Sequence, residues 1–421
     1  MKKNQKVNIA LFTLNLKTSG VLRIISTLSL FLEKEYNVHI LVSDVNPPDF
    51  ILPFDFGGKV CYLNVYDHSK RNFLNKIFKN YSRYKKLKKY KIDNKIDITI
   101  SFSENPNIHN IMTKSKDKAI IAIHSFTSRN VIDVLKNGIY TLFYKIFIKR
   151  YFNKADKIIT VSSEIKEDLI KNFSINQDII EVLHNPHDLE RIKTLSKERL
   201  AIDHGAIFQE YFTILNVGHM CPAKGQWNLI RAFSIVSKKI QTAKLIIIGS
   251  AEPKLKKLIV KLTEDLELKE SVLFLDYQIN PFNFIANADV YVASSIYEGL
   301  PNVLIETLAC STPIISTDCK SGPREILAPS TDSQVTTDNI EYAEYGILTP
   351  PSKQGFLDAS IAITNEEKLL SEAIINLYSN KSMQIEYSKK GYKRSKDFGI
   401  DKIIEEYNNL FNKILEENNN G

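Results

Sequence analysis

Two glutamates that lie eight residues apart, Glu298 and Glu306, flank a segment in which a turn runs into a predicted helix. Gly-Leu-Pro fills residues 299–301. Glycine tolerates unusual backbone angles, whereas proline suits the first position of a helix but not its interior. We therefore expect the helix to begin near Pro301 or Asn302, with Glu298 in the preceding loop and Glu306 one turn inside.

The first turn of this helix is a candidate anion site. The amides of Asn302, Val303 and Leu304 are expected to point out of the helix start, where unpaired N–H groups and the helix dipole favour an anion such as a diphosphate. A carboxylate on either side suits hydroxyl-rich groups at both ends of the ligand, which is the layout of a sugar nucleotide. The spacing of the glutamates alone also fits a solvated helix face.

The longer string around the glutamates is more specific. Residues 294–325 read SSIYEGLPNVLIETLACSTPIISTDCKSGPRE, and SGPRE continues as SGPREIL. This string resembles the retaining glycosyltransferases of family 4, which have the GT-B fold, and in particular the bacterial type that assembles lipopolysaccharide, capsule and other glycans. The resemblance implies that Glu298 lies near the sugar hydroxyls and Glu306 near the ribose. It also implies that Arg324 and Glu325 lie on a loop facing the cleft.

Length and patterning predict an α/β protein with two domains. The 421 residues exceed what one hydrophobic core usually supports. Short β-branched runs alternate with longer amphipathic segments, which is typical of parallel sheets with crossover helices. The expected strands are residues 7–14, 38–42, 98–102, 119–123, 157–161 and 180–183 in the first half, and 212–217, 244–248, 272–275, 290–293 and 313–316 in the second. The phrase EYGILTPP resembles the family's next strand and turn.

A polar segment at residues 188–209 is predicted to link two doubly wound, Rossmann-like domains that face a cleft. The N-terminal domain, 1–195, is expected to bind the acceptor, and the C-terminal domain, 196–395, is expected to bind the nucleotide sugar. A last helix, at about 396–421, is expected to return to the N-terminal domain, as in GT-B enzymes. Ligands in such sheets bind at the carboxyl ends of the strands.

Two positions in the first half are candidates for contacts with the donor. Gly20 resembles a family glycine that lets the backbone approach the donor phosphate, although Ser19 replaces the glycine that commonly precedes it. A plain strand-to-helix turn is the other interpretation of Gly20. His124 follows a predicted strand, at a position where the family places a histidine near the donor hexose; a lone histidine also fits a structural role.

The second half opens with the family's phosphate-binding pattern, here GHMCPAKG from Gly218 to Gly225. The family motif supplies an arginine directly after the first glycine and a lysine before the second, and these cations neutralise the diphosphate. Lys224 matches the lysine of the family motif. His219 stands in place of the arginine, and an imidazole cannot donate two parallel hydrogen bonds to a phosphate as a guanidinium does. Backbone groups near Tyr277 are expected to contact the base.

Basic residues are unevenly distributed in a chain whose formal net charge is +8. Ten basic residues and no acidic one lie between Lys70 and Lys91, interleaved with apolar residues at helical spacing, and residues 139–152 combine aromatics with three basic residues. A basic amphipathic helix binds an anionic membrane surface. A solvated helix packed by its aromatic stripe is the alternative. Nucleic-acid binding is not expected, because no recognised motif accompanies the charge.

The chain is expected to be cytoplasmic, with possible peripheral contact at the inner face of the membrane. The apolar run at the N-terminus is interrupted by polar residues and reads as a buried strand, not as a signal peptide. No apolar run reaches the roughly 18 to 20 residues that span a bilayer. The four cysteines form no Cys-x-x-Cys pair, which fits a reducing compartment.

Together these features predict an enzyme that moves a hexosyl or N-acetylhexosaminyl group, with retention, from a nucleoside diphosphate sugar to a glycan or lipid-linked acceptor hydroxyl. A UDP-sugar is the favoured donor, and no metal or other cofactor is expected because the chain lacks Asp-x-Asp. The expected catalytic residues are Glu298, His124 and Lys224, and the expected donor-binding residues are Gly20, Gly218, His219, Lys224, Tyr277, Gly299, Leu300, Asn302, Val303, Leu304 and Glu306. A non-catalytic nucleotide-sugar or anion-binding protein and a basic membrane-surface adaptor are the alternatives.

Overall fold

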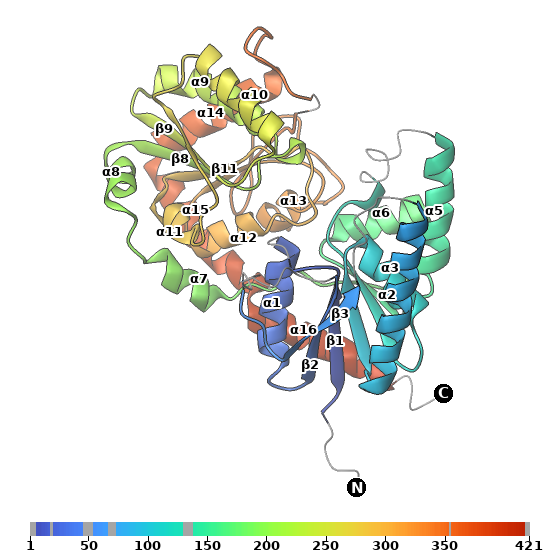
Figure 1. Cartoon of the computed structure of the whole chain (residues 1–421). Coiled ribbons are helices and arrows are strands. Elements are labelled where there is room, and N and C mark those ends of the chain that lie inside the picture. The colour runs from blue at the N-terminus through green and yellow to red at the C-terminus, as the bar shows by residue number, and fades with distance from the viewer. Residues whose placement is uncertain are drawn as a thin grey trace. The chain divides into compact units, whose positions relative to one another are not determined.

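The computed structural model describes residues 6–16, 20–44, 54–65, 73–128, 138–352 and 355–416. Contacts within the chain divide it into two compact units (Figure 1). Unit 1 contains Met1–Pro186 and Ile400–Gly421, and unit 2 contains His187–Gly399. The polar segment 188–209, which the sequence predicts as a linker, therefore belongs to unit 2.

Unit 1 is built on a parallel sheet with the strand order β3-β2-β1-β4-β5-β6-β7. Its central strands are buried along nearly their whole length, as expected for a sheet that helices cover on both faces. The strands are β1 Asn8–Thr13, β2 Asn37–Asp44, β3 Lys59–Val65, β4 Ile98–Phe102, β5 Lys118–Ile123, β6 Lys157–Thr160 and β7 Ile180–Val182.

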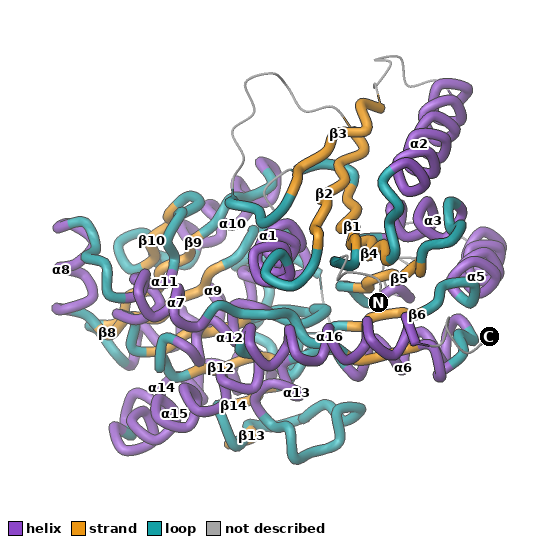
Figure 2. The backbone as a smooth tube through the Cα atoms, turned by 90° about the horizontal axis from the view of Figure 1, so that it is seen from below, coloured by secondary structure: helices purple, strands orange, loops and turns teal. Residues whose placement is uncertain are grey.

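Alternation along β1 sends its side chains to the two faces of this sheet. Ile9 and Leu11 pack with apolar residues of α1 and α16, which lie side by side (Figure 2). Ala10 and Phe12 pack with Leu87 of α2 on the other face. The helices of unit 1 are α1 Gly20–Leu32, α2 Phe73–Asp93, α3 Glu104–Met112, α5 Gly138–Phe152, α6 Ser163–Phe173 and α16 Ile400–Glu416, with a 3-10 turn at Gln177–Ile179.

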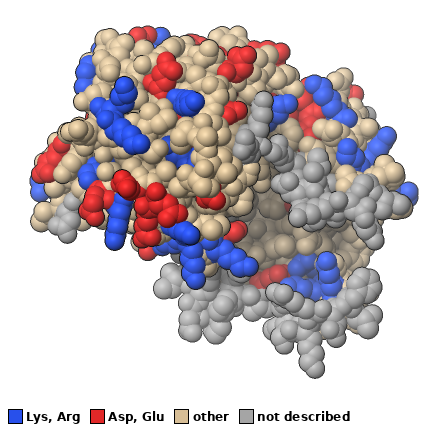
Figure 3. All heavy atoms as spheres, turned by 90° about the horizontal axis from the view of Figure 1, so that it is seen from above, with Lys and Arg blue, Asp and Glu red and all other residues tan. Residues whose placement is uncertain are grey.

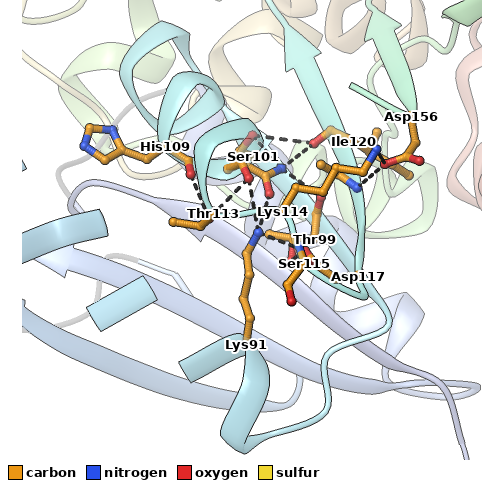
Figure 4. A network of polar contacts seen from close by, with 12 residues as sticks. Lys91, Thr99, Ser101, His109, Thr113, Lys114, Ser115, Asp117, Ile120 and Asp156 are labelled. Atoms are coloured by element: carbon orange, nitrogen blue, oxygen red, sulfur yellow. Dashed lines mark hydrogen bonds and ion pairs between the residues drawn. The ribbon is translucent and has the colours of Figure 1, made fainter. Parts of the chain in front are cut away.

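A buried polar network joins α2 to α3 and to the sheet (Figure 4). The ammonium of Lys91 lies 2.8 Å from a carboxylate oxygen of Asp117, and it donates to the side-chain oxygen of Asn110 at 2.7 Å. Thr99 of β4 donates to the same Asp117 oxygen at 2.9 Å. Burial lowers the pKa of Lys91, and the charge of Asp117 opposes this shift. The network thus fixes α2 and α3 against β4 and β5.

Unit 2 contains a second sheet, with the strand order β10-β9-β8-β11-β12-β14-β13. All pairings are parallel except that of β13 with β14. The strands are β8 Phe212–Val217, β9 Ala243–Ile248, β10 Val272–Leu275, β11 Val290–Ala293, β12 Ile314–Thr317, β13 Glu341–Tyr342 and β14 Ile347–Thr349. Each sheet thus forms the core of a Rossmann-like α/β unit, as predicted.

Helices of unit 2 pack around one continuous core that includes Trp227, Phe233 and Ile374. The buried guanidinium of Arg231 pairs with Glu367 at 2.7 Å and so ties α9 to α14. The helices are α7 Leu189–Ser196, α8 Ile202–Glu210, α9 Gln226–Lys239, α10 Pro253–Asp265, α11 Phe282–Asn287, α12 Asn302–Ala309, α13 Pro323–Leu327, α14 Asn365–Ser379 and α15 Lys381–Ser395, with 3-10 turns at Pro222–Lys224 and Lys396–Phe398.

Every strand that the sequence predicts is present, with ends that differ by at most two residues. The unpredicted strands lie at sheet edges. β3 alternates buried and exposed side chains because it borders the sheet, and β13 has only two residues. The prediction that residues 188–209 form a linker is wrong, because residues 189–196 and 202–210 form α7 and α8. Helix α7 packs against α11 and α12, which explains its place in unit 2.

Candidate active site

The loop that carries Glu298 is held by backbone hydrogen bonds on two sides. On one side Ile296 donates its amide to Ala223 at 2.7 Å. On the other side Glu298 donates its amide to the carbonyl of Lys320 at 2.9 Å. The loop therefore runs between the turn before α9 and the turn before α13, and both turns belong to unit 2. Such bracing fixes the position of the Glu298 side chain relative to Lys224.

Gly225 allows the turn before α9 to approach the loop that carries Glu298. Its φ is +56°, a left-handed conformation, and a Cβ added there would lie 2.6 Å from the carbonyl oxygen of Ser294. Any side chain would push the Glu298 loop away from Lys224. The glycine of the phosphate-binding pattern thus acts in this structure through close backbone packing.

Lys224 and Glu298 form an ion pair in which the ammonium lies 2.6 Å from Oε1 of the carboxylate. Burial lowers the pKa of Lys224, but the charge of Glu298 and its hydrogen bond outweigh burial, so the pKa is raised. Lys224 therefore stays cationic at neutral pH. The side chains of Lys224 and Glu298 are 25 % and 13 % exposed, so ligands can reach both.

These two side chains line a small pocket. Asn216 and Tyr291 lie in its wall, together with Val303 of α12. The Asn216 amide donates to the carbonyl of Val292 at 2.8 Å, whereas none of the residues that the structure describes donates to its buried Oδ1. Burial raises the pKa of Tyr291, whose hydroxyl donates to the carbonyl of Val217. The pocket thus combines a cation, a carboxylate and an unused amide oxygen.

Helix α12 begins at Asn302, where the turn sequence predicts its start. The amide of Leu304, however, donates to the carbonyl of Pro301 at 2.9 Å, and its side chain is fully buried. The expectation that this amide points at an anion is therefore wrong, because the helix uses it in its own first turn. Leu300 and Glu306 are also largely buried.

Gly218 and His219 follow β8, at the carboxyl edge of the sheet. Gly218 lies beside Lys224, since a Cβ added to it would be 3.7 Å from Lys224 Cε. His219 is exposed, and its Nδ1 lies 2.9 Å from the hydroxyl of Ser250. Tyr277 follows β10 at the same edge and is 49 % exposed. The structure thus places Gly218, His219 and Tyr277 just after the ends of β8 and β10, which lie on either side of β9.

Arg324 occupies a different environment from the one expected of a ligand-facing residue. It is buried and donates to Asp318, Glu341 and Thr331. Burial lowers the pKa of Arg324, and the two carboxylates raise it by more, so the guanidinium is held permanently charged. Arg324 therefore braces the segment after α13, and the expected cleft-facing role does not fit. Glu325 is partly buried.

Two of the predicted donor contacts lie in unit 1. Gly20 is the first residue of α1, and Ser19 lies outside the described residues. His124 follows β5, and its ring stacks on Phe102 with centroids 5.7 Å apart. Burial lowers the pKa of His124 to about 4, against a smaller opposing effect of Asn185, so the imidazole is neutral at pH 7.

Sequence reasoning missed Ser295 and Asn216. Ser295 donates its hydroxyl to Glu298 at 2.6 Å, and Asn216 lies in the pocket wall at the end of β8. The position of Asn216 at a strand end was an available signal. Nothing local distinguished Ser295 from the adjacent Ser294, because the loop conformation decides which hydroxyl faces the carboxylate.

Comparison with known proteins assigns the chain to a family. The model named Glycosyltransferase Family 4 matches residues 18–191, and the model named Glycosyl transferases group 1 matches residues 197–345. The chain is 34 % identical over 352 residues to an uncharacterised glycosyltransferase of Methanocaldococcus jannaschii, covering 82 % of this chain and 86 % of the relative. The chain therefore belongs to glycosyltransferase family 4, as the resemblance predicts, and is an enzyme of that class.

A second relative has a specific name. It is the N-acetylgalactosamine-N,N'-diacetylbacillosaminyl-diphospho-undecaprenol 4-alpha-N-acetylgalactosaminyltransferase of Campylobacter jejuni, 29 % identical over 381 residues that cover 90 % of this chain and 94 % of the relative. Among solved structures, Anabaena HepE in complex with UDP matches with a TM-score of 0.72 at 14 % identity, covering 97 % of this chain and 100 % of that one. This likeness supports the predicted GT-B fold.

Proposed function

We propose that this glycosyltransferase moves a hexosyl or N-acetylhexosaminyl group from a UDP-sugar, with retention of anomeric configuration, to a hydroxyl of a glycan or lipid-linked acceptor. The observation that carries this proposal is the pairing of Lys224 with Glu298 in one pocket beside the start of α12. A cation suits the diphosphate, and a carboxylate suits the hydroxyls of the sugar. The named relatives are consistent with such a reaction.

Each of the main residues that the sequence singles out has a role in this proposal. Lys224 stabilises the negative charge that develops on the departing diphosphate, which is the main task of the protein when a sugar leaves a phosphate. Glu298 accepts hydrogen bonds from the sugar hydroxyls, and Glu306 accepts from the ribose. His219 is an auxiliary donor to phosphate, and backbone groups near Tyr277 contact the base. His124 contacts the hexose as a neutral imidazole.

The preference for UDP and the independence from metal are parts of the same proposal. HepE, whose fold this chain shares, is described in complex with UDP, which supports the choice of base. The chain has no Asp-x-Asp motif, by which many other glycosyltransferases hold a divalent metal. The positive charge of Lys224 and the start of α12 supply the electrostatic stabilisation that a metal would otherwise provide.

The acceptor is proposed to be linked to a lipid. The Campylobacter relative is named for a diphospho-undecaprenol substrate, and unit 1 exposes two similar stripes of apolar residues. The stripes lie on α2 and α5, which both pack against α3 and so belong to one layer. The stripes are Ile77, Phe78 and Tyr81 on α2, and Leu142, Phe143 and Ile146 on α5. None of the helices in the described part of the chain has the length and apolar character that crossing a bilayer requires.

Basic residues accompany these stripes. Lys76 and Lys85 belong to α2, and Lys145 and Lys149 belong to α5. Apolar side chains that enter the headgroup region, combined with cations that meet anionic lipids, favour peripheral binding. Acidic and basic side chains are interspersed over much of the face drawn in Figure 3, so the net charge does not form one uniform field there.

A thermal-shift screen tests the donor assignment. UDP-sugars are expected to raise the melting temperature more than GDP- or ADP-sugars do, and EDTA is expected to leave both the shift and the transfer rate unchanged. Lys224→Ala and Glu298→Ala are expected to lose transfer. Intact activity in both variants would contradict the assigned roles, and binding of UDP-sugars without transfer to any tested acceptor would favour a non-catalytic binding protein.

Vesicle flotation tests the membrane contact. The chain is expected to float with vesicles that contain phosphatidylglycerol, and Phe78→Ser with Phe143→Ser is expected to abolish flotation. Ile385→Ser is the control, because Ile385 is 56 % exposed on α15 of unit 2. Flotation that needs no apolar residue of α2 or α5 would contradict this surface. Flotation without any effect of UDP on the melting temperature would instead favour a membrane adaptor.

A further inference from the structure

Ser295 and Lys224 both donate to the same carboxylate oxygen of Glu298. Its hydroxyl donates to Oε1 of Glu298 at 2.6 Å, and the ammonium of Lys224 lies 2.6 Å from the same oxygen. Ser295 is itself buried, and its carbonyl accepts a hydrogen bond from the hydroxyl of Thr317. The serine is thus fixed by β12 on one side and directed at the carboxylate on the other.

The two contacts leave the Glu298 carboxylate with unequal oxygens. Oε1 accepts two short hydrogen bonds, one of them from a cation, whereas in the part of the chain that the structure describes no hydrogen bond reaches Oε2. Hydrogen bonds that involve a charged group are stronger than neutral ones. The carboxylate is therefore held by one oxygen and presents the other.

A bound diphosphate would change this balance. Lys224 is the only cation that an ion pair connects to Glu298 among the described residues, and the proposed reaction also requires Lys224 at the phosphates. When the ammonium turns toward a phosphate, its hold on Oε1 weakens. The hydroxyl of Ser295 cannot leave in this way, because the serine is buried within the braced loop.

We infer that Ser295 is a positioning residue for the donor sugar: it holds Oε1 of Glu298 while Lys224 serves the diphosphate, so that Oε2 stays directed at the hydroxyls of the sugar. The inference rests on the proposed function, since it assumes that Glu298 faces the sugar and Lys224 the diphosphate. It adds a residue whose effect depends on the sugar and is independent of the nucleotide.

Binding measurements separate this role from a structural one. The dissociation constants of UDP and of the UDP-sugar with the largest thermal shift are measured by calorimetry for the wild type and for Ser295→Ala. We expect Ser295→Ala to weaken the UDP-sugar about tenfold, as the loss of one hydrogen bond to a charged group implies, and to change UDP by less than about twofold. Lys224→Ala is expected to weaken both ligands.

A double-mutant cycle with Glu298→Ala tests whether Ser295 acts through the carboxylate. Adding Ser295→Ala to Glu298→Ala is expected to change the UDP-sugar affinity by less than about twofold, because no carboxylate is left to position. Ser295→Thr, which keeps the hydroxyl, is expected to restore most of the affinity. Ser234→Ala is the matched control, since Ser234 is equally buried in unit 2 but donates to the backbone carbonyl of Arg231.

The outcomes are distinguishable. Equal weakening of UDP and UDP-sugar by Ser295→Ala, or a full effect in the Glu298→Ala background, would overturn the positioning role and leave the proposed function intact. If no UDP-sugar binds the wild type while another nucleotide sugar does, the same cycle is run with that donor. If no nucleotide sugar binds at all, the proposed function fails and the inference fails with it.

Discussion

Lys91 in unit 1 and Lys224 in unit 2 each pair with a carboxylate, and their surroundings differ. The side chain of Lys91 is 2 % exposed, and its ammonium donates to Asp117 and to both oxygens of Asn110. Lys224 is 25 % exposed, and in the described part of the chain its ammonium donates to Glu298 alone. Burial lowers the pKa of Lys91, whereas Glu298 raises that of Lys224.

The difference separates a structural ion pair from one that the proposed function places at a ligand. An ammonium has three N–H donors. Lys91 uses all of them inside the protein, so it has nothing to offer a ligand (Figure 4). In the described part of the chain Lys224 uses one, and the proposed function assigns the others to a phosphate. Lys91 is thus both more buried than Lys224 and saturated with acceptors, as expected of a charge that serves the fold alone.

Removal of Lys91 is expected to give the largest effect on stability. Lys91→Ala leaves Asp117 buried without its counter-charge, which should lower the free energy of unfolding by about 3 to 5 kcal/mol. Urea denaturation followed by circular dichroism measures this loss. The double variant Lys91→Met with Asp117→Leu is the control and should recover most of the stability. A loss below about 1 kcal/mol in the single variant would contradict a saturated structural pair.

Removal of Lys224 is expected to act on the reaction and to spare the fold. Lys224→Ala should lower the transfer rate about 10²- to 10³-fold, because a preorganised donor to the leaving group is lost. Its unfolding free energy should change by less than about 1 kcal/mol, since Glu298 remains partly exposed. Lys390→Ala, which breaks an exposed ion pair on α15, is the control. A loss of stability without a loss of rate would erase the contrast with Lys91.

A variant of Arg324 tests whether the role of a charged residue depends on the saturation of its donors or on its location near the pocket. It lies in unit 2 near the pocket, yet its guanidinium is taken up by Asp318, Glu341 and Thr331. Arg324→Ala should therefore lower the free energy of unfolding by about 3 kcal/mol and change the affinity for UDP by less than about twofold. Calorimetry and urea denaturation on the same preparation provide both values. A folded variant with strongly reduced UDP affinity would show that location matters more.

His124 gives the smallest expected effect, and it depends on pH. Burial lowers its pKa to about 4 from the ordinary 6.5, so between these values the unfolded chain binds more protons than the folded chain. Stability contributed by this group is therefore lost as the pH falls through that window, by about 1 to 2 kcal/mol at pH 5. His124→Gln should lose correspondingly less stability between pH 7 and pH 5, whereas His219→Gln, an exposed control, should behave like the wild type.

The sequence predicts what local physics decides. Apolar β-branched runs predict the strands, and Gly-Leu-Pro predicts the start of α12 at Asn302. Contacts between side chains that lie far apart in the sequence could not be predicted from it. Lys224 meets Glu298 across 74 positions, and Arg231 meets Glu367 across 136. The likeness to known enzymes suggested the importance of Glu298, but only the folded chain shows which cation pairs with it.

The errors have the same origin. Arg324 looked available because its partners Asp318 and Glu341 come together only when β13 pairs with β14. The amide of Leu304 looked unpaired because the first turn of a helix leaves some amides unused, and the tightness of that turn depends on its surroundings. The polar segment before β8 resembled a linker because its helices bury few residues of their own.

Helix α16 has a consequence for the order of synthesis. Its apolar stripe, which includes Ile403, Tyr407 and Phe411, completes the core beneath α1, although more than two hundred residues of unit 2 separate it from the rest of unit 1. A ribosome makes all the strands of unit 1 before it makes this helix. On a nascent chain, unit 2 can bury its core before unit 1 can. The unit that is translated first is therefore the last to be completed.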